Sequence, residues 1–353
     1  MQTALGQRRS TCSPTFQLAC CQRIAKPRLG VGMVSYRSIA VIVAASALLT
    51  VVQPAGAQDL QRVERQCSGN DGVPLPQQID ACTRLIETSG LVPEHLAAAF
   101  YNRGTAYKAN ADFDRAIADL HQAIRLNPAD ADAFCNRGFA YYGKGELDRA
   151  IRDFDEALRI SPGMTLAFYG RGLARSVMGA HDKAIADFDQ VIRVDPADAD
   201  AFYQRGTSYV QKGEKDRAIE DFNHAIALNP SNADAFNGRA SAYMFKGDVD
   251  RALADYNRAI SMNPRLAQAF FGRGYTYNMR REYDRAIADY DVAIKLKATW
   301  AAAFAARADA YTFKGENDRA AADLDHAIRL EPERGAELCP KIKAVGWQVP
   351  ACR

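Results

Sequence analysis

The chain has few of the residues from which catalytic and metal sites are built. It contains only five histidines and eight cysteines among 353 residues, and the histidines are scattered. The sequence has no H-E-x-x-H pair, no C-x-x-C pair, no glycine-rich phosphate loop and no G-x-S-x-G elbow. Because each of these motifs holds a nucleophile, a metal ligand or a phosphate at a fixed spacing, their absence predicts a protein that is not an enzyme and uses no cofactor or metal.

Acidic residues are missing from residues 1–57, which carry six of the 45 basic residues. Without this segment the remainder has 39 basic and 42 acidic residues, so the net charge of +3 becomes −3. Binding to nucleic acid draws most of its affinity from Lys and Arg at phosphates. No basic excess remains for that purpose, and nucleic acid is not expected as a partner.

Long apolar runs are also scarce: residues 39–52 form the only one. Arg37 precedes it and the small-x-small sequence Ala55-Gly56-Ala57 follows it, which is the pattern of a secretory signal cleaved after Ala57. The run is shorter than the roughly 20 residues of a membrane span, so no stable span is expected after cleavage. The alternatives are an uncleaved anchor or a simple apolar helix. Since residues 1–32 make an unusually long lead, we expect translation to start at Met33.

Most of the remaining chain is one repeated pattern with a period of 34 residues, in seven copies without a gap. Such a period is the sequence signature of a stacked-repeat fold. The seventh position of every copy, for example, is an arginine: Arg103, Arg137, Arg171, Arg205, Arg239, Arg273 and Arg307. The seven copies span residues 97–130, 131–164, 165–198, 199–232, 233–266, 267–300 and 301–334.

The fourth copy shows what the pattern contains. Its small, aromatic and proline positions hold Gly206, Tyr209, Ala218, Phe222, Ala225 and Pro230. This pattern resembles the tetratricopeptide repeat very closely. The resemblance implies an all-α fold, a right-handed α-solenoid of seven tandem helix-turn-helix repeats. The layout of the whole chain also resembles exported tetratricopeptide proteins of alphaproteobacteria, which implies a periplasmic or secreted location.

Each copy reads as two helices, A and B, joined by a tight turn. In the fourth copy helix A is expected over residues 199–212, and Gly213 supplies the left-handed residue that ends it. We expect Asp216 to cap the start of helix B. The Asn229-Pro230 step should end that helix, because the residue before a proline avoids helical angles.

Two flanking segments, residues 58–96 and 335–353, read as caps that cover the open ends of the stack. Residues 77–90 resemble a lone half-repeat helix in the first cap. Each cap contains two cysteines, and the simplest pairing joins Cys67 with Cys82 and Cys339 with Cys352. Four free thiols are the alternative. The odd cysteine, Cys135, is either a small groove residue or a reactive thiol.

The seven recurring arginines have two interpretations. They could form a ladder that binds anions, or each could pair with a recurring aspartate and bridge helices, for which a planar guanidinium is well suited. We favour the structural ladder and predict Arg205 within salt-bridge distance of Asp216, Asp221 or a matching aspartate of the adjacent repeat. Repeat three, with Arg175 in place of tyrosine, and repeat six, with Arg281 in place of glycine, should bend or loosen the array.

Function is expected at positions that change from copy to copy. By resemblance to the family, positions 2, 5, 9 and 12 of helix A line a concave groove. The candidate protein-binding residues there are Tyr101, Thr105, Phe139, Tyr142, Tyr169, Leu173, Tyr203, Thr207, Asn237, Phe271 and Tyr275. Tyrosine is a good anchor for a peptide or helix, since it combines a large area with a polar tip. The alternative is that these aromatics pack against neighbouring repeats.

Two functions follow. The first is an exported scaffold or adaptor that binds a peptide or helix of a protein partner in its groove. The alternative is a structural, envelope-organising protein that acts through self-association, without a peptide ligand.

Overall fold

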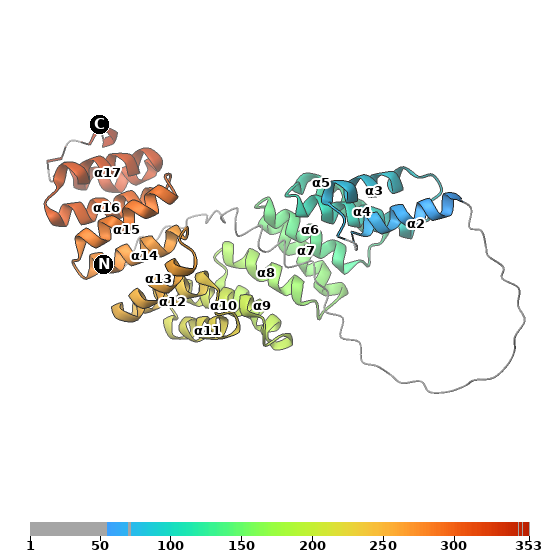
Figure 1. Ribbon diagram of the computed structural model, residues 1–353, viewed down its shortest axis with the longest axis horizontal. Helices are drawn as coiled ribbons and strands as arrows, with labels where there is room; N and C mark the ends of the chain where they lie inside the picture. The colour runs from blue at the N-terminus through green and yellow to red at the C-terminus, as the bar shows by residue number, and fades with distance from the viewer. Residues whose placement is uncertain (1–54, 70–71, 345, 348, 353) are drawn as a thin grey trace, which may run out of the picture. The chain divides into compact units, whose positions relative to one another are not determined.

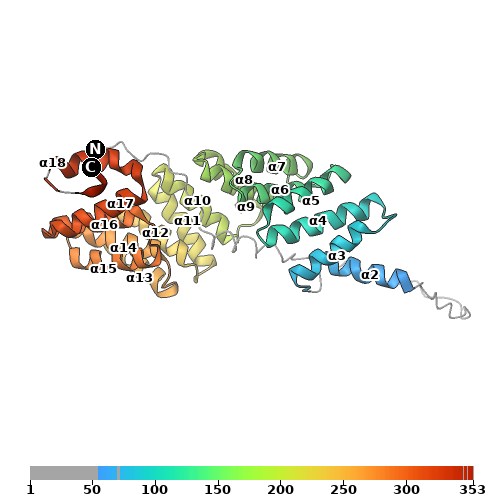
Figure 2. The same cartoon turned by 90° about the horizontal axis from the view of Figure 1, so that it is seen from above.

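The computed structural model describes residues 55–353 except 70–71, 345, 348 and 353 (Figures 1 and 2). The described chain is built of helices and contains no strand, which confirms the predicted all-α solenoid class. No helix in this part is long and apolar enough to cross a membrane. The expected start at Met33 and the apolar run of residues 39–52 lie outside the described residues.

The chain divides into two compact units, residues 1–180 and 181–353. The division falls inside repeat three, between its helix A, α8 (Thr165–Val177), and its helix B, α9 (His181–Val194). Loosening was expected in this repeat. It was also expected in repeat six, but within that repeat α14 (Ala267–Met279) and α15 (Tyr283–Leu296) pack as closely as the helix pairs of other repeats.

In the first unit each helix packs on the next along the chain. The repeat helices are α4 (Pro93–Ala109), α5 (Phe113–Leu126), α6 (Ala131–Gly143), α7 (Leu147–Ile160) and α8. They follow a cap made of α2 (Ala55–Ser68) and α3 (Leu75–Glu87), which the Cys67–Cys82 disulfide joins. The cap is therefore a helix pair rather than the lone half-repeat helix expected. The cleavage point expected after Ala57 falls in the first turn of α2.

The second unit continues the same pattern from α9. Its further repeat helices are α10 (Ala199–Lys212), α11 (Lys215–Leu228), α12 (Ala233–Lys246), α13 (Val249–Met262), α14, α15, α16 (Ala301–Lys314) and α17 (Asn317–Leu330). A short turn η1 (Pro332–Arg334), helix α18 (Gly335–Ala344) and turn η2 (Pro350–Cys352) form the far cap against α17. The Cys339–Cys352 disulfide ties α18 to η2.

The turn between helices A and B requires a left-handed residue. Gly213 supplies it with φ +78°, at no steric cost. In repeats one and six the same place is held by Ala111 and Arg281, which adopt φ values of 57° and 63°. A side chain in this conformation costs on the order of 1 kcal/mol per residue, so the packing of the helices on either side imposes the turn.

Asp216 does not cap helix B, contrary to expectation. The residue at the cap of α11 is Glu214, whose side chain makes no capping hydrogen bond. Asp216 is the second residue of the helix and pairs instead with Lys246 at the end of helix A of the next repeat. The same link joins Lys144 to Asp114, Lys212 to Asp182, Arg280 to Asp250 and Lys314 to Asp284. The recurring aspartate is thus part of a link between repeats.

The recurring arginines join helices in the way the structural interpretation requires. Arg205 donates from Nε and Nη2 to the two carboxylate oxygens of Asp221 on its own helix B, at 2.8 and 2.7 Å. Its third nitrogen, Nη1, reaches Asp189 on helix B of the preceding repeat. We call this arrangement the arginine clasp. The same two-oxygen pairing joins Arg103 to Asp119, Arg137 to Asp153, Arg239 to Asp255, Arg273 to Asp289 and Arg307 to Asp323.

Arg171 takes up the link to the preceding repeat, donating to Asp155 at 2.6 Å. The clasp arginines are largely covered: the side chains of Arg137 and Arg205 are only 13% and 19% exposed. Seven arginines open to solvent would have favoured anion binding. The observed clasps make these residues part of the scaffold.

An aromatic ring on helix B fills the space between repeats. Phe222 is fully buried and lies against Gly206 of its own helix A and Gly238 of the next. A methyl group at Gly238 would meet the Phe222 ring at 2.7 Å, so only glycine fits there without a shift. The equivalent rings Phe154, Phe188, Tyr256 and Tyr290 are buried as well. This row of rings forms the floor under helix A.

Candidate binding face

One side of each unit is formed by helix A of successive repeats. The A helices contact one another directly, from α4 to α6 and α8 in the first unit and from α10 to α12, α14 and α16 in the second. Helix B packs mainly on its own helix A and on that of the next repeat. The A helices therefore line the inner side of each stack, and we call positions 5, 9 and 12 of these helices the helix-A face. All eleven candidate binding residues lie on it.

The first unit has a fully connected polar group on this face. Asn136 donates from Nδ2 to the hydroxyl of Tyr101 at 3.0 Å and accepts at Oδ1 from the ammonium of Lys108. Asn136 and Lys108 are both buried, and the Lys108 nitrogen lies 5.6 Å from the centre of the Phe139 ring. The polar side chains here satisfy one another.

Burial sets the charge states around this group. It raises the pKa of the Tyr101 phenol above its ordinary value, with the Asp132 carboxylate adding to the effect. It also raises the pKa of the Cys135 thiol to about 12. Cys135 is fully buried and packs with Ala150 and Phe154 in the core. Neither reading of this cysteine holds: it does not line the groove, and a covered, protonated thiol is not reactive.

The predicted aromatics are shared between core and surface. The ring centres of Phe139 and Phe154 are 5.0 Å apart, and those of Tyr203 and Phe222 are 5.9 Å apart. One side of each of these candidate rings packs on a buried ring of helix B, and the other side stays partly exposed. The alternative that these aromatics pack within the array therefore holds for one side of each ring. Leu173 is buried and belongs to the core, whereas Tyr275 is 43% exposed. The predicted set therefore mixes core and surface residues.

The second unit has a different arrangement on the same face. The Phe271 ring lies 4.6 Å from the Trp300 ring and 5.7 Å from the Tyr290 ring, measured between centres. The hydroxyl of Tyr290 is buried and makes no hydrogen bond within the described residues, and the same holds for Oδ1 of Asn237 and of Asn278. Burial, and then the charge of Asp309, raise the pKa of Tyr290, so its hydroxyl stays protonated and can donate.

Sequence reasoning missed Trp300, Tyr290 and Asn278. Trp300 precedes helix A of repeat seven and is one of only two tryptophans in the chain. It follows Ala298, where the repeat pattern otherwise has proline, and this departure was the available signal. Tyr290 was assigned to the scaffold because its position is aromatic in most copies. The neighbouring repeat shows the contrast, since the hydroxyl of Tyr256 is 3.1 Å from that of Ser241.

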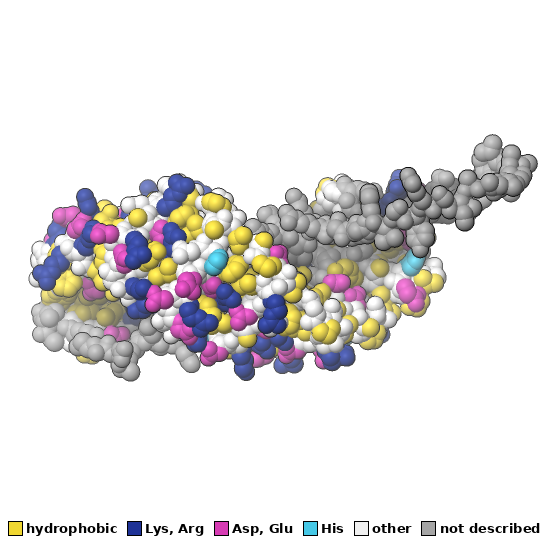
Figure 3. Space-filling model, turned by 90° about the horizontal axis from the view of Figure 1, so that it is seen from below, with side chains coloured by type: hydrophobic (Ala, Val, Ile, Leu, Met, Phe, Trp, Pro, Cys, Tyr) yellow, Lys and Arg dark blue, Asp and Glu magenta, His cyan; other side chains and the backbone are white. Residues whose placement is uncertain are grey.

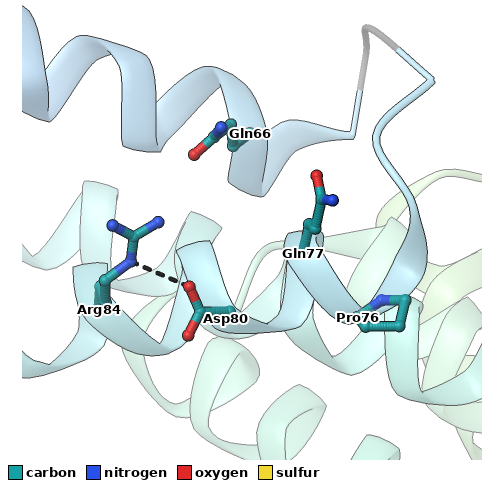
Figure 4. A pocket seen from close by; sticks show the side chains of 5 residues that line it. All are labelled: Gln66, Pro76, Gln77, Asp80 and Arg84. Carbon is teal, nitrogen blue, oxygen red and sulfur yellow. Dashed lines mark ion pairs between the residues drawn. The ribbon is translucent and has the colours of Figure 1, made fainter.

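A shallow pocket lies outside the repeats, between α2 and α3 of the first cap (Figure 4). It is lined by Gln66, Pro76, Gln77, Asp80 and Arg84, and Arg84 pairs with Asp80 at 3.2 Å. Within the described part of the chain, no group of three or more His, Cys, Asp or Glu residues is placed to hold a metal ion. On the face drawn in Figure 3, basic and acidic side chains are interspersed.

Models of protein families match almost all of the repeat region. A model described as tetratricopeptide repeat matches residues 101–165 and 237–303. A model described as TPR repeat matches residues 177–213 and 206–247, and a third, again described as tetratricopeptide repeat, matches residues 301–334. No curated protein matches the chain significantly.

Solved structures share the fold. A tetratricopeptide repeat protein from Parabacteroides merdae is 21% identical, with a TM-score of 0.57 over 74% of this chain and 99% of that one. A chain of the APC/C hetero-tetramer Cut9–Hcn1 is 17% identical, with a TM-score of 0.59 over 78% of this chain and 52% of that one. YrrB, a TPR protein described as having an unusual peptide-binding site, is 26% identical over 51% of this chain and 92% of its own, with a TM-score of 0.42.

Proposed function

Because this chain belongs to the tetratricopeptide repeat family, whose repeats serve as scaffolds for protein–protein interaction, we propose that it binds an extended or helical segment of a partner protein on the helix-A face of its second unit. One observation carries the proposal. Tyr290, Asn237 and Asn278 hold buried polar atoms that make no hydrogen bond within the described residues. Tyr290 lies beside the Phe271 ring, which also packs on the Trp300 ring.

A peptide has the chemistry that these atoms lack. A buried donor or acceptor without a partner costs about 1–3 kcal/mol. A peptide backbone offers an N–H and a C=O at nearly every residue. The three atoms are covered in the unliganded protein, so a peptide reaches them only when a covering side chain turns aside. Its N–H groups then donate to the asparagine oxygens and a C=O accepts from the Tyr290 hydroxyl. The neighbouring aromatic rings supply apolar area for a side chain of the ligand.

The first unit is less suited to the same task. Its Asn136 is already satisfied on both sides, by Tyr101 and by Lys108. A ligand there would have to displace a buried ammonium from its partner before gaining any hydrogen bond. Binding is therefore assigned to the second unit, with Tyr203, Phe271 and Tyr275 as its aromatic contacts.

The test compares one atom at equivalent places in two repeats. Random-sequence peptides displayed on phage are selected on the purified protein, and a selected peptide is measured by fluorescence anisotropy. Tyr290→Phe removes a hydroxyl that has no partner, so it should leave the melting temperature unchanged or raised while weakening the peptide by about tenfold. Tyr256→Phe is the matched control, since it breaks the bond to Ser241 and should lower stability while leaving affinity unchanged.

A second pair of variants concerns exposed residues, which are safe for folding. Tyr275→Ala should weaken the same peptide, whereas Leu228→Ala, on the equally exposed but opposite helix B, should not. Unchanged affinity in both Tyr290→Phe and Tyr275→Ala would show that the peptide binds elsewhere and would end the proposal for this face.

We also infer that the scaffold works outside the cytoplasm. The signal pattern in residues 35–57 supports export, and so do the two disulfides, which form and persist in oxidising compartments. A reporter that is active only after export, fused behind residue 96, should be active, and N-terminal sequencing of the product should begin at Gln58. An inactive reporter, or a product that retains residues 39–52, would refute cleavage and export.

A further inference from the structure

An exposed apolar row lies at the turn end of helix A in the last three repeats. It consists of Phe245, Met279 and Phe313, which are 56%, 52% and 65% exposed. The three residues occupy the same position in successive repeats, so they follow one another along a single edge of the second unit. We call them the turn-edge row. The Phe313 ring stacks on Tyr283, with centres 5.4 Å apart and planes 11° from parallel.

The row does not belong to the repeat pattern. The other copies hold Ala109, Gly143, Val177 and Gln211 at this position. In the first unit the ring of Phe113 packs over Gly143 and covers the edge. A scaffold role would demand the same residue type in every copy. Three large apolar side chains that are exposed only in the last three repeats indicate contact with something outside the unit.

Most charges beside the row are already paired, and the exposed Arg281 is the exception within the described residues. Each apolar residue is followed by a basic one, and that base pairs with an aspartate of the preceding repeat: Lys246 with Asp216, Arg280 with Asp250, and Lys314 with Asp284. The edge therefore carries one base–aspartate pair per repeat. A nucleic acid or an anionic membrane would favour a surplus of one sign. Paired charges beside an apolar row leave the hydrophobic contact as the main attraction for a second copy.

We propose that the turn-edge row is the contact through which two copies of this chain form an antiparallel dimer about a two-fold axis. The order Phe-Met-Phe reads the same in both directions. A two-fold axis at Met279 therefore sets Phe245 against Phe313 of the second copy, and Met279 against its own counterpart.

The spacing of the repeats argues for the same occupant. The interval between apolar side chains is fixed by the repeat, and a second copy has that interval by construction. In the antiparallel arrangement the base–aspartate pairs of one copy flank those of the other. The contact buries aromatic and methionine side chains, which are enriched at the centres of interfaces. Met279 lies one turn beyond Tyr275 on α14, so the row adjoins the helix-A face at its turn end. Phe245 and Phe313 themselves are not among the residues assigned to peptide binding, so the two activities can be tested with separate variants.

Sedimentation equilibrium of the purified protein tests the association. The wild-type chain should show a concentration-dependent equilibrium between monomer and dimer. The double variant Phe245→Ser/Phe313→Ser should raise the dissociation constant by about tenfold or more, since two buried rings are lost. The matched control is Val194→Ser/Leu228→Ser, which removes two exposed apolar side chains from helix B and should leave the equilibrium unchanged. A monomer at every concentration, or a dimer insensitive to the row variants, would refute the proposal.

Cysteine cross-linking tests the geometry. Met279→Cys should form a disulfide-linked dimer by itself under mild oxidation. Phe245→Cys and Phe313→Cys should each remain monomeric in non-reducing gels but should cross-link when mixed. The native free cysteine, Cys135, is buried and does not compete. Efficient cross-linking of Phe245→Cys alone would mean another arrangement and would overturn the two-fold model.

A flotation assay with phosphatidylglycerol vesicles tests whether a membrane, rather than a second copy, contacts the row. The proposal expects no co-flotation, or co-flotation that the Phe245→Ser/Phe313→Ser variant retains. If the wild-type protein floated as a monomer and this variant did not, the row would be a membrane contact and the dimer would be refuted. Peptide affinity, measured on the same variants, should be unchanged, so failure of the dimer is distinguishable from failure of the groove.

Discussion

The same face of the repeat has different polar contacts in the two units. In the first unit Asn136, Tyr101 and Lys108 satisfy one another, and the face is closed by its own hydrogen bonds. In the second unit the buried polar atoms of Asn237, Asn278 and Tyr290 make no such bonds within the described residues. The arginine clasp is common to both units. A fixed scaffold thus carries a self-satisfied surface at one end and an unsatisfied one at the other.

The turn edges of the two units differ as well, and again the second unit leaves more of its surface without a partner. Phe113 covers the turn edge of the first unit by packing on Gly143, while Phe245 and Phe313 leave that of the second unit apolar and open. Both differences come from positions that the repeat does not constrain. The comparison shows that repeats with the same scaffold can differ in surface, and our proposal assigns recognition to the second unit.

Opening an arginine clasp should have the largest effect on the free energy of unfolding. If the two units share one scaffold, the loss should be equal in both. Arg137→Met and Arg239→Met each leave a buried carboxylate without its partner, which costs about 3–5 kcal/mol. Urea unfolding followed by far-UV circular dichroism measures the loss. Adding Asp153→Leu to Arg137→Met should restore much of it. A large cost in one unit and a small one in the other would break the idea of a common scaffold.

The caps come next, because each is tied to one unit only. Replacing Cys67 and Cys82 by serine opens a link with a sequence separation of 15 and should cost about 3 kcal/mol, confined to the first unit. Hydrogen exchange read by mass spectrometry should show lost protection in α3 and none in α17. The matched variant without Cys339 and Cys352 should show the reverse. Equal loss of protection in both helices would mean that the caps are not local.

The polar groups give the most direct comparison of the two faces. Asn136→Ala removes the acceptor of the Lys108 ammonium and the donor to the Tyr101 hydroxyl, and it should lower the free energy of unfolding by about 2 kcal/mol. Asn237→Ala removes an oxygen that has no partner and should be close to neutral. Thermal unfolding of both variants decides the point. Equal losses would show that the unpartnered atoms of the second unit are not distinctive.

The smallest effect concerns pH and the start of the second unit. Burial, followed by the charge of Lys212, lowers the pKa of His181 below its ordinary 6.5, and Asp182 opposes the shift. The unfolded chain therefore binds a proton first as pH falls. Stability is complete above the unfolded pKa and is lost as pH falls through the folded one. The melting temperature should drop slightly below about pH 6.5 in wild type and less in His181→Asn. An unchanged drop would assign the pH effect to another group.

The fold could be predicted because its signals are local and repeated. Gly213 ends helix A and Asn229-Pro230 ends helix B within a few residues of sequence, and seven copies average out the exceptions. The partner of Arg205 was within the predicted set, since Asp221 lies on the facing helix of the same repeat. The two disulfides followed from closeness in sequence.

What escaped prediction depends on how one repeat sits on the next. Asp216 looked like a cap, but the offset between repeats brings Lys246 to its carboxylate. Cys135 shares a groove position with tyrosines, yet its small side chain turns into the core. The unpartnered state of Tyr290 could not be predicted either. In the neighbouring repeat the hydroxyl of Tyr256 meets that of Ser241. The position equivalent to Ser241 is Tyr275 in the repeat of Tyr290, so that partner is absent there.

The arginine clasp has a consequence for how such a chain can change in length. Each clasp spans a boundary, since Arg205 holds Asp221 of its own repeat and Asp189 of the one before. Its acceptor on the preceding repeat varies, as with Asn257 for Arg273, but always offers an oxygen or nitrogen lone pair. The arginine joint can therefore close between different copies, whereas ring packing limits which copy can follow, because only glycine fits at Gly238 after Phe222 without a shift. Duplicating or deleting one whole copy rebuilds the arginine joint, and it preserves the ring packing as well where the following copy has a glycine at this position.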